Sequence, residues 1–225
     1  MPTVDAAPQN EEWIHQFADA DAVLTYSDWA KGVIDSQSGG SVNTICSAPP
    51  SASREFAMIS DKGAAKEALG IPADCKIIGT VMRNQRRKLF PTLFEAFGKY
   101  LKRTGDKKTY LHCHTSYPDG GWDFAELLHR NDISSRVFFT YICNKPDCAS
   151  VEIAKFNDAR KSCSSCRDFS STQTHVNNGV EDEILAKIYN MYDLYIQCAN
   201  CEGFGLPQVE AAACGVPVAL SLIHI

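Results

Sequence analysis

Residues 202–218 read EGFGLPQVEAAACGVPV, and this stretch decides the fold of the chain. Gly203 and Gly205 allow tight turns and a close approach of a ligand to the main chain. Pro207 suits the first position of a helix, because its missing N–H would have no partner there in any case. The loop and the helix start therefore present free N–H groups and the positive end of a helix dipole, which together favour an anion such as a diphosphate.

The helix that follows is predicted to run from Pro207 to Cys214. Glu210 lies one turn inside it, close enough to accept hydrogen bonds from hydroxyl groups of the same ligand. Gly215 ends the helix, and the next strand is expected at 216–220. A strand–turn–helix corner without a ligand has the same local pattern, so a Gly-x-Gly alone is a weak signal, whereas the whole stretch is more specific.

Strands and amphipathic helices alternate upstream of this stretch. Lys76–Met82 is predicted as a strand, and apolar residues from Leu89 to Leu101 follow it at helical spacing. Strands that alternate with helices form right-handed crossovers in a parallel sheet. We therefore predict a doubly wound, Rossmann-like α/β domain over residues 76–220, with its ligand beyond the carboxyl ends of the strands. Further strands are expected at 109–115, 137–141 and 193–199, and further helices at 122–128 and 183–192.

Shorter elements are predicted before this domain. Ala20–Tyr26 and Ser41–Cys46 read as strands, and Ser27 is a suitable cap for a helix between them. A brief helix is expected at 64–69. These elements are too few to form a complete second domain.

A basic stretch lies at and just past the end of the first strand of the predicted domain, where residues 79–88 read GTVMRNQRRK. A diphosphate leaving group needs positive charge where its negative charge develops. Basic residues are disfavoured at a helix N-terminus unless an anion is nearby. Arg83 and Lys88 are therefore candidate phosphate ligands, and a solvated basic helix start is the alternative.

The two stretches together resemble the retaining glycosyltransferases of family 4, which have the GT-B fold and a signature of two glutamates separated by seven residues. Glu202 and Glu210 have this spacing. The resemblance implies that Glu202 contacts the hydroxyls of the donor sugar and that Glu210 binds the ribose of the nucleotide. It also implies that Arg83 and Lys88 grip the diphosphate, with Arg86 and Arg87 as competitors for the role of the lysine. The loop amides that would hold the diphosphate belong to Gly203, Phe204, Gly205 and Leu206.

The resemblance implies transfer of a hexose from a nucleotide-diphosphate sugar to a hydroxyl acceptor, which is a saccharide, a lipid or a protein glycan, with retention of anomeric configuration. Glu202, Arg83 and Lys88 would be the catalytic residues, and the leaving phosphate would act as the base. No catalytic metal is expected, because the two basic residues supply the positive charge.

A complete GT-B enzyme has two Rossmann-like domains, and the resemblance covers only the second of them well. Residues 1–75 are therefore interpreted as a remnant of the N-terminal acceptor domain and the interdomain linker, with most of that domain missing. Residues 221–225 are interpreted as a non-native tail. The alternative function is that of a truncated, non-catalytic module that binds a nucleotide sugar or that interacts through a zinc ribbon.

Ten cysteines without a secretory signal should be thiols or metal ligands rather than disulfides. Cys143 and Cys148 form one close pair, Cys163 and Cys166 form a second, and 14 residues separate the pairs. This spacing predicts a structural zinc ribbon in an insertion at 143–171, with four thiolate ligands and no open catalytic position. Free thiols in a flexible loop are the alternative. The remaining cysteines, including Cys198 and Cys201, are interpreted as small core residues.

Two other features lie on the second strand of the domain and just after it. His112 and His114 point to the same face of that strand, and a structural role is favoured over contact with the donor. Residues 119–122, DGGW, form a loop at the ligand edge and are assigned to the acceptor side.

Composition excludes several classes of protein. The chain is 44% hydrophobic and 22% charged, so it can bury a core. Its net charge is −5 and its longest basic block has three residues, so no nucleic-acid partner is expected. No apolar run reaches the roughly 18 residues that suggest a membrane span. The N-terminus is polar and acidic, unlike a signal peptide, so the expected location is cytoplasmic.

Overall fold

The computed structural model describes residue 4 and residues 6–222, and these form two compact units. The smaller unit comprises Met1–Ser51 and Cys201–Leu206, and the larger comprises Ala52–Asn200 and Pro207–Ile225. Part of the predicted tail, residues 223–225, lies outside the described residues.

In the smaller unit, β1 (Val23–Thr25) and β2 (Thr44–Ser47) pair in parallel and are joined by α2 (Asp28–Ser38). The predicted cap is confirmed, because the side chain of Ser27 accepts a hydrogen bond from the Ala30 N–H at 3.1 Å. A helix that the sequence did not lead us to expect, α1 (Glu11–Ala18), precedes this motif and begins at an Asn10 cap. Its Ile14 and Phe17 pack into the small core of this unit, which also contains Val4, Val23, Ala30, Ile34 and Val42.

The larger unit is built on a mostly parallel sheet with the strand order β6-β5-β4-β3-β8-β9. The predicted α/β fold is therefore confirmed, with one difference at the edge: two short strands of the cysteine-rich insertion pair antiparallel with β5. The parallel strands are β3 (Lys76–Val81), β4 (Thr109–His114), β5 (Val137–Cys143), β8 (Leu194–Ala199) and β9 (Val218–Leu222); the antiparallel ones are β6 (Val151–Lys155) and β7 (Ser171–Gln173).

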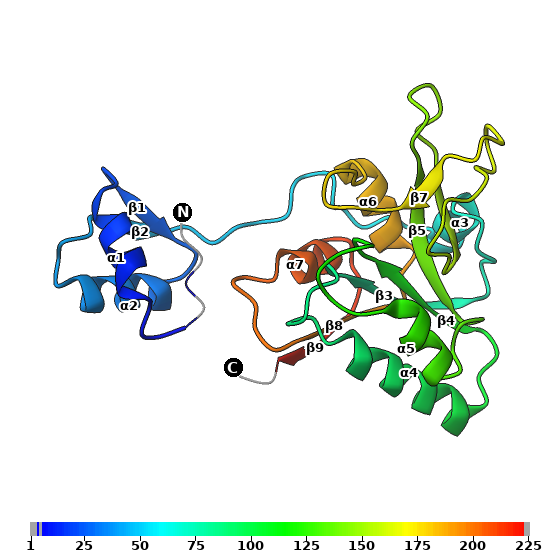
Figure 1. Cartoon of the computed structure of the whole chain (residues 1–225), viewed down its shortest axis with the longest axis horizontal. Coiled ribbons are helices and arrows are strands. Elements are labelled where there is room, and N and C mark those ends of the chain that lie inside the picture. Colours follow the sequence, from blue (N-terminus) through cyan, green and yellow to red (C-terminus); the bar gives the residue numbers. More distant parts are fainter. Residues whose placement is uncertain (1–3, 5, 223–225) are drawn as a thin grey trace. The chain divides into compact units, whose positions relative to one another are not determined.

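Helices cover both faces of this sheet, so the unit is doubly wound (Figure 1). Consecutive residues of β3 point to opposite faces of the sheet and so enter two separate cores. Ile77 joins the core beneath α6 and α7, and Ile78 packs against the core beneath α4 and α5. The apolar stripe of α4 predicted from its periodicity is buried, including Phe90, Phe94 and Phe97. The helices are α3 (Lys62–Ala68), α4 (Phe90–Thr104), α5 (Phe124–Arg130), α6 (Asp182–Asn190) and α7 (Leu206–Ala213).

Gly79 on β3 is required by the packing of an aromatic ring. A Cβ atom at this position would lie 2.2 Å from Cε2 of Tyr192, whose side chain is fully buried and whose hydroxyl lies 2.8 Å from Nδ1 of His112. We therefore expect Gly79→Ala to lower the free energy of unfolding by about 1–3 kcal/mol, as overpacking of a core does. Urea denaturation measures this, with Gly120→Ala as the control, because nothing lies within 4 Å of that Cβ position. Equal losses in the two variants would contradict the packing argument.

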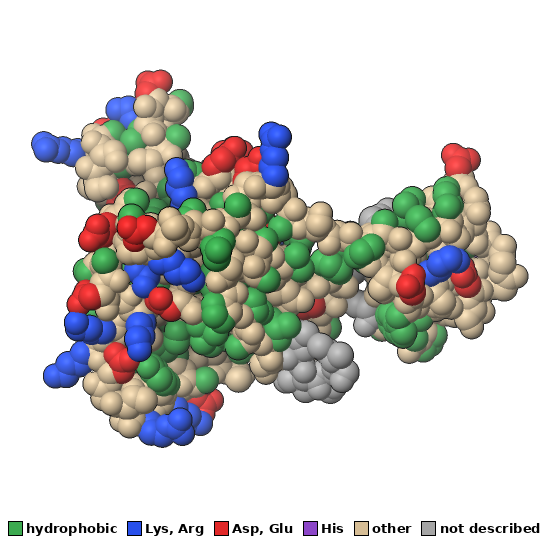
Figure 2. All heavy atoms as spheres, turned by 180° about the vertical axis from the view of Figure 1, so that it is seen from behind, with side chains coloured by type: hydrophobic (Ala, Val, Ile, Leu, Met, Phe, Trp, Pro, Cys, Tyr) green, Lys and Arg blue, Asp and Glu red, His purple; other side chains and the backbone are tan. Residues whose placement is uncertain are grey.

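The surface of the described residues mixes charge types. On the face shown in Figure 2, acidic and basic side chains are interspersed over the larger unit. Among the described residues, no helix is both long enough and apolar enough to cross a membrane.

Candidate functional site

The two predicted basic residues lie on the loop that joins β3 to α4, past the carboxyl end of β3. This loop runs along the end of β8: the Asn200 N–H donates to the Arg87 carbonyl at 2.9 Å, and the Leu89 N–H donates to the Cys198 carbonyl at 2.9 Å. Lys88 itself forms a β-bridge with Ala199. The basic loop is thereby fixed at the sheet edge from which the chain continues into the loop of Glu202.

Arg83 and Lys88 differ in their accessibility. The side chain of Arg83 is 54% exposed and pairs with Asp119, whereas Lys88 is 6% exposed. In this conformation Arg83 is the better placed of the two to contact a ligand from solvent. The pairing with Asp119 was not foreseen, since 36 residues separate the partners in sequence.

Glu210 lies in α7 of the larger unit and is 9% exposed. Its Oε2 accepts a hydrogen bond from the Tyr189 hydroxyl at 2.7 Å. Burial raises the pKa of the Glu210 carboxyl, and the Tyr189 hydrogen bond opposes that rise. The carboxylate is thus held in one orientation by a tyrosine that sequence reasoning did not identify and that only the tertiary fold brings near.

The remaining predicted donor residues, Glu202 to Leu206, form a loop that belongs to the smaller unit. Gly205 has a φ of 79°, in the left-handed region that a residue without Cβ adopts at little cost, as the tight-turn argument requires. Phe204 packs there against Tyr26, with ring centroids 6.2 Å apart and an angle of 54° between the rings. Leu206 is 37% exposed, and Glu202 and Gly203 are half-buried.

The four cysteines of the insertion come together, as their spacing predicts. Their Sγ atoms all lie within 4.8 Å of one another, with 3.6 Å between Cys143 and Cys166 and 3.8 Å between Cys148 and Cys163. A tetrahedral site with metal–sulfur bonds of about 2.3 Å has sulfur–sulfur distances of about 3.8 Å. The cluster therefore has the donor set and the dimensions to hold a metal ion.

Both cysteine pairs end in the same backbone conformation. The residue after each second cysteine has a positive φ: 44° at Ala149 and 63° at Arg167. Hydrogen bonds from the Ser150 hydroxyl and from the Cys166 N–H lower the pKa of Cys163 to about 6. The pKa of Cys166, in contrast, is raised to about 11 by burial and the neighbouring thiols, so the argument for ligation rests on the distances between the sulfur atoms.

The other cysteines divide into two groups. Cys75, Cys113, Cys198 and Cys214 are buried, which agrees with their interpretation as core residues. Cys46 and Cys201 are exposed, so that interpretation is wrong for both of them. Cys46 lies on β2, whose two central residues, Ile45 and Cys46, are both exposed.

His112 and His114 take part in a hydrogen-bond network between strands, which is consistent with the structural role that the sequence favours. Nδ1 of His114 and Nε2 of His112 lie 3.0 and 3.1 Å from the hydroxyl oxygen of Thr140, and Nδ1 of His112 lies near the Tyr192 hydroxyl. Burial lowers the pKa of His114 to about 4 and that of His112 well below its usual range. Both imidazoles are therefore neutral at physiological pH and serve the buried network.

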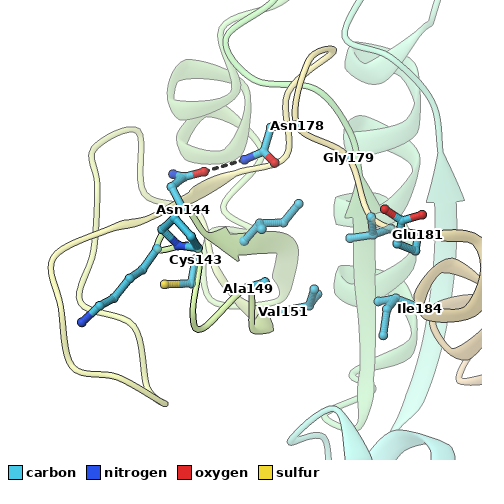
Figure 3. A pocket seen from close by; sticks show the side chains of 12 residues that line it. Cys143, Asn144, Ala149, Val151, Asn178, Gly179, Glu181 and Ile184 are labelled. Carbon is cyan, nitrogen blue, oxygen red and sulfur yellow. Dashed lines mark hydrogen bonds between the residues drawn. The ribbon is translucent and has the colours of Figure 1, made fainter.

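A pocket of about 500 Å³ lies beside the cysteine cluster, between the end of β5 and the start of α6 (Figure 3). Val151 and Ile184 give it apolar walls, and Glu181 adds a carboxylate at its border. The Asn178 amide donates to Oδ1 of Asn144 at 2.5 Å across its polar side. The pocket is at the carboxyl end of β5, the same edge of the parallel sheet as the basic loop after β3.

The doubly wound sheet of the larger unit, with a basic loop at its carboxyl edge, has the fold of a GT-B glycosyltransferase domain. Residues 168–223 match the family model of glycosyl transferases group 1. A comparison with curated proteins gives no match.

Solved structures of similar fold include several sugar-transferring enzymes. Sucrose-phosphate synthase from Thermosynechococcus elongatus has a TM-score of 0.61 and 21% identity over 95% of this chain and 45% of its own. The pneumococcal O-GlcNAc transferase GtfA, solved with UDP and GlcNAc, has a TM-score of 0.58 and 14% identity over 96% and 33%. HepE of Anabaena, solved with UDP-glucose, has a TM-score of 0.57 and 17% identity over 89% and 44%. The chain thus spans less than half the length of these structures, and at such identities the likeness concerns the fold.

Proposed function

We propose that this chain carries the donor-binding part of a retaining glycosyltransferase that transfers a hexose from a nucleoside-diphosphate sugar to a hydroxyl acceptor. The observation that carries the proposal is the basic loop, with Arg83 and Lys88 fixed at the carboxyl edge of the sheet between β3 and β8. It is supported by the glycosyl transferases group 1 match over residues 168–223, which includes the glycine loop and Glu210. Similar folds have been solved with UDP-glucose and with UDP.

Each residue has a role in this proposal. Arg83 and Lys88 neutralise the charge that develops on the leaving diphosphate, and the amides of residues 203–206 bind its oxygens. Glu210 accepts hydrogen bonds from the ribose, and Glu202 accepts them from the hydroxyls of the donor sugar. The bond between the anomeric carbon and the phosphate oxygen breaks while the acceptor oxygen bonds to that carbon on the same face. The acceptor proton passes to the departing phosphate, so no metal ion is needed for charge neutralisation.

The pocket beside α6 is our candidate for the nucleoside part of the donor. Its apolar walls suit the faces of a flat ring, and the amides of Asn144 and Asn178 suit its hydrogen-bonding edges. Its place at the carboxyl edge of the sheet supports this assignment, since ligands of such sheets bind there.

We further propose that residues 1–75 belong to the acceptor domain and the interdomain linker. The acceptor would be a saccharide, a lipid or a protein glycan. Because the chain spans less than half of its structural relatives, the chain by itself is proposed to bind the donor without transferring the sugar.

Zinc is our proposal for the metal of the four-cysteine cluster. Four thiolates at these distances suit its tetrahedral preference, and a site with four protein ligands has no open position for a substrate. Its role is structural: it closes the insertion between β5 and β7.

Titration calorimetry with UDP, GDP and ADP tests the proposed function. We expect one of them to bind and Arg83→Ala to weaken that binding about tenfold to a hundredfold, the worth of a hydrogen bond to a charged group. Arg160→Ala, which removes an exposed arginine from the insertion, is the control and should bind as the parent does. Binding of none of the three nucleotides, or equal binding by the two variants, would overturn the proposal.

A further inference from the structure

The loop between β4 and α5, residues 116–122, packs directly against the basic loop of residues 83–88. Both loops follow neighbouring parallel strands, β4 and β3, and therefore emerge at the same edge of the sheet. The sequence assigns residues 119–122 to the acceptor side, which stays a prediction. The contacts of this loop with the basic loop point to a further role.

Asp119 holds the guanidinium of Arg83 from one side. Nε of Arg83 donates to Oδ2 of Asp119 at 3.2 Å, and Nη2 donates to Oδ1 at 3.3 Å. Asp119 is fixed in turn by the Ser116 hydroxyl at 2.5 Å and the Gly120 N–H at 2.8 Å, and its side chain is only 14% exposed. A guanidinium has five N–H donors, so this side-on pairing leaves three of them to meet a phosphate.

Trp122 holds the backbone of the same loop. Its N–H donates to Oδ1 of Asn84 and its carbonyl accepts from Nδ2 of Asn84, each at 2.8 Å. Its indole N–H donates to the Lys88 carbonyl at 2.8 Å, and the Arg86 guanidinium lies 4.7 Å from its ring centroid. The two loops pack closely at Gly121, since a Cβ atom at this position would lie 2.2 Å from Oδ1 of Asn84. One tryptophan therefore contacts three successive parts of the basic loop.

We propose that Asp119 and Trp122 are positioning residues that hold Arg83 and the main chain around Lys88 in place for a diphosphate. The inference rests on the proposed function and adds to it. The long side chains and the main chain of this loop have many conformations, so a loop that was not held in place would lose binding free energy when a ligand ordered it. The hydrogen bonds of Asp119 and Trp122 already order this loop before a ligand binds, and a preorganised site gains affinity in this way.

The charge of Asp119 makes the test decisive. If Asp119 were only a neighbouring negative charge, its removal would strengthen the binding of an anionic diphosphate. If it positions Arg83, its removal weakens that binding. The two interpretations predict opposite signs for Asp119→Asn, a change that keeps the size of the side chain.

The experiment measures the affinities of the best-binding nucleoside diphosphate among UDP, GDP and ADP and of the matching monophosphate. For both Asp119→Asn and Trp122→Phe we expect the diphosphate to bind about two- to tenfold more weakly, the worth of one hydrogen bond, with the monophosphate little affected. A general loss of structure would weaken both ligands alike. Glu95→Gln, which removes an equal charge from the exposed side of α4, should change neither affinity.

The outcomes distinguish a failure of the proposed donor-binding function from a failure of the positioning role alone. If the parent binds none of the three diphosphates, the proposed function fails and this inference fails with it. If the parent binds but Asp119→Asn binds the diphosphate equally well or more tightly, only the positioning role is overturned. Should Trp122→Phe lower the melting temperature sharply, the Asp119→Asn result decides, because that change leaves the packing around the tryptophan intact.

Discussion

Cys163→Ser is expected to abolish metal binding at the four-cysteine cluster and to unfold the insertion while the parallel sheet stays folded. Cys163 is buried, and its Sγ lies 3.8 Å from that of Cys148. The free energy of binding a structural zinc in small modules is about 10–16 kcal/mol, and such modules are unfolded without it. The turns around the cluster have little apolar packing, since Phe169 is 65% exposed, whereas Ile153 and Phe156 of the same insertion pack against the cores of the sheet.

Two measurements check this expectation. Metal analysis of the purified parent should give about one zinc ion per chain, as expected for four ligands at one site, and analysis of the variant should give none. Hydrogen exchange should show loss of protection in the turns around the cluster, at 144–150 and 161–170, with protection of β3 and β4 retained. Cys46→Ser is the control, because it removes an exposed thiol outside the cluster. A parent without metal, or a variant that retains it, would contradict the assignment.

The parallel sheet and the cysteine cluster could be predicted from the sequence because their signals are local. The apolar residues of α4 recur at helical spacing, and the two cysteine pairs are short motifs whose ligand geometry is restrictive. Helix α1 was missed although Asn10 and the apolar positions Ile14 and Phe17 carried its signal. Its apolar face is small, because Ile14 is buried and Phe17 only partly so, and Glu11 and Glu12 make its first turn acidic.

The contacts that orient the candidate site residues could not be predicted. Asp119 is 36 residues from Arg83, and Tyr189 is 21 residues from Glu210, so no periodicity or spacing relates the partners. The antiparallel pairing of β6 and β7 was missed for a similar reason, because β7 has only three residues and follows a polar stretch. Such pairs depend on the tertiary arrangement, which brings together the ends of strands that are distant in sequence.

Glu210→Ala is expected to weaken nucleoside-diphosphate binding by about a hundredfold. A hydrogen bond to a charged group contributes about 1.5 kcal/mol at the lower end of its range, so two ribose hydroxyls contribute about 3 kcal/mol, and tenfold in affinity corresponds to 1.4 kcal/mol. Calorimetry should also show that the parent prefers the ribonucleotide to its 2′-deoxy analogue and that the variant has lost most of this preference. Glu183→Ala, on the neighbouring helix α6, is the control. If the variant binds as the parent does, Glu210 has no part in the nucleotide site.

Tyr189→Phe should change the pH at which binding is lost, since the Tyr189 hydroxyl favours the ionised form of Glu210. Burial already raises the pKa of Glu210, and the hydrogen bond at 2.7 Å opposes that rise, so its removal raises the pKa further. Ionised Glu210 is the acceptor, so affinity falls as the pH drops through its pKa, and this fall should begin at a higher pH in Tyr189→Phe. The ratio of variant to parent affinity between pH 5 and 8 isolates the effect, because the titration of the phosphate is common to both. Tyr192→Phe removes a buried hydroxyl that bonds His112 instead and should leave the ratio flat. A flat ratio for Tyr189→Phe as well would mean that Glu210 binds the nucleotide without help from this hydrogen bond.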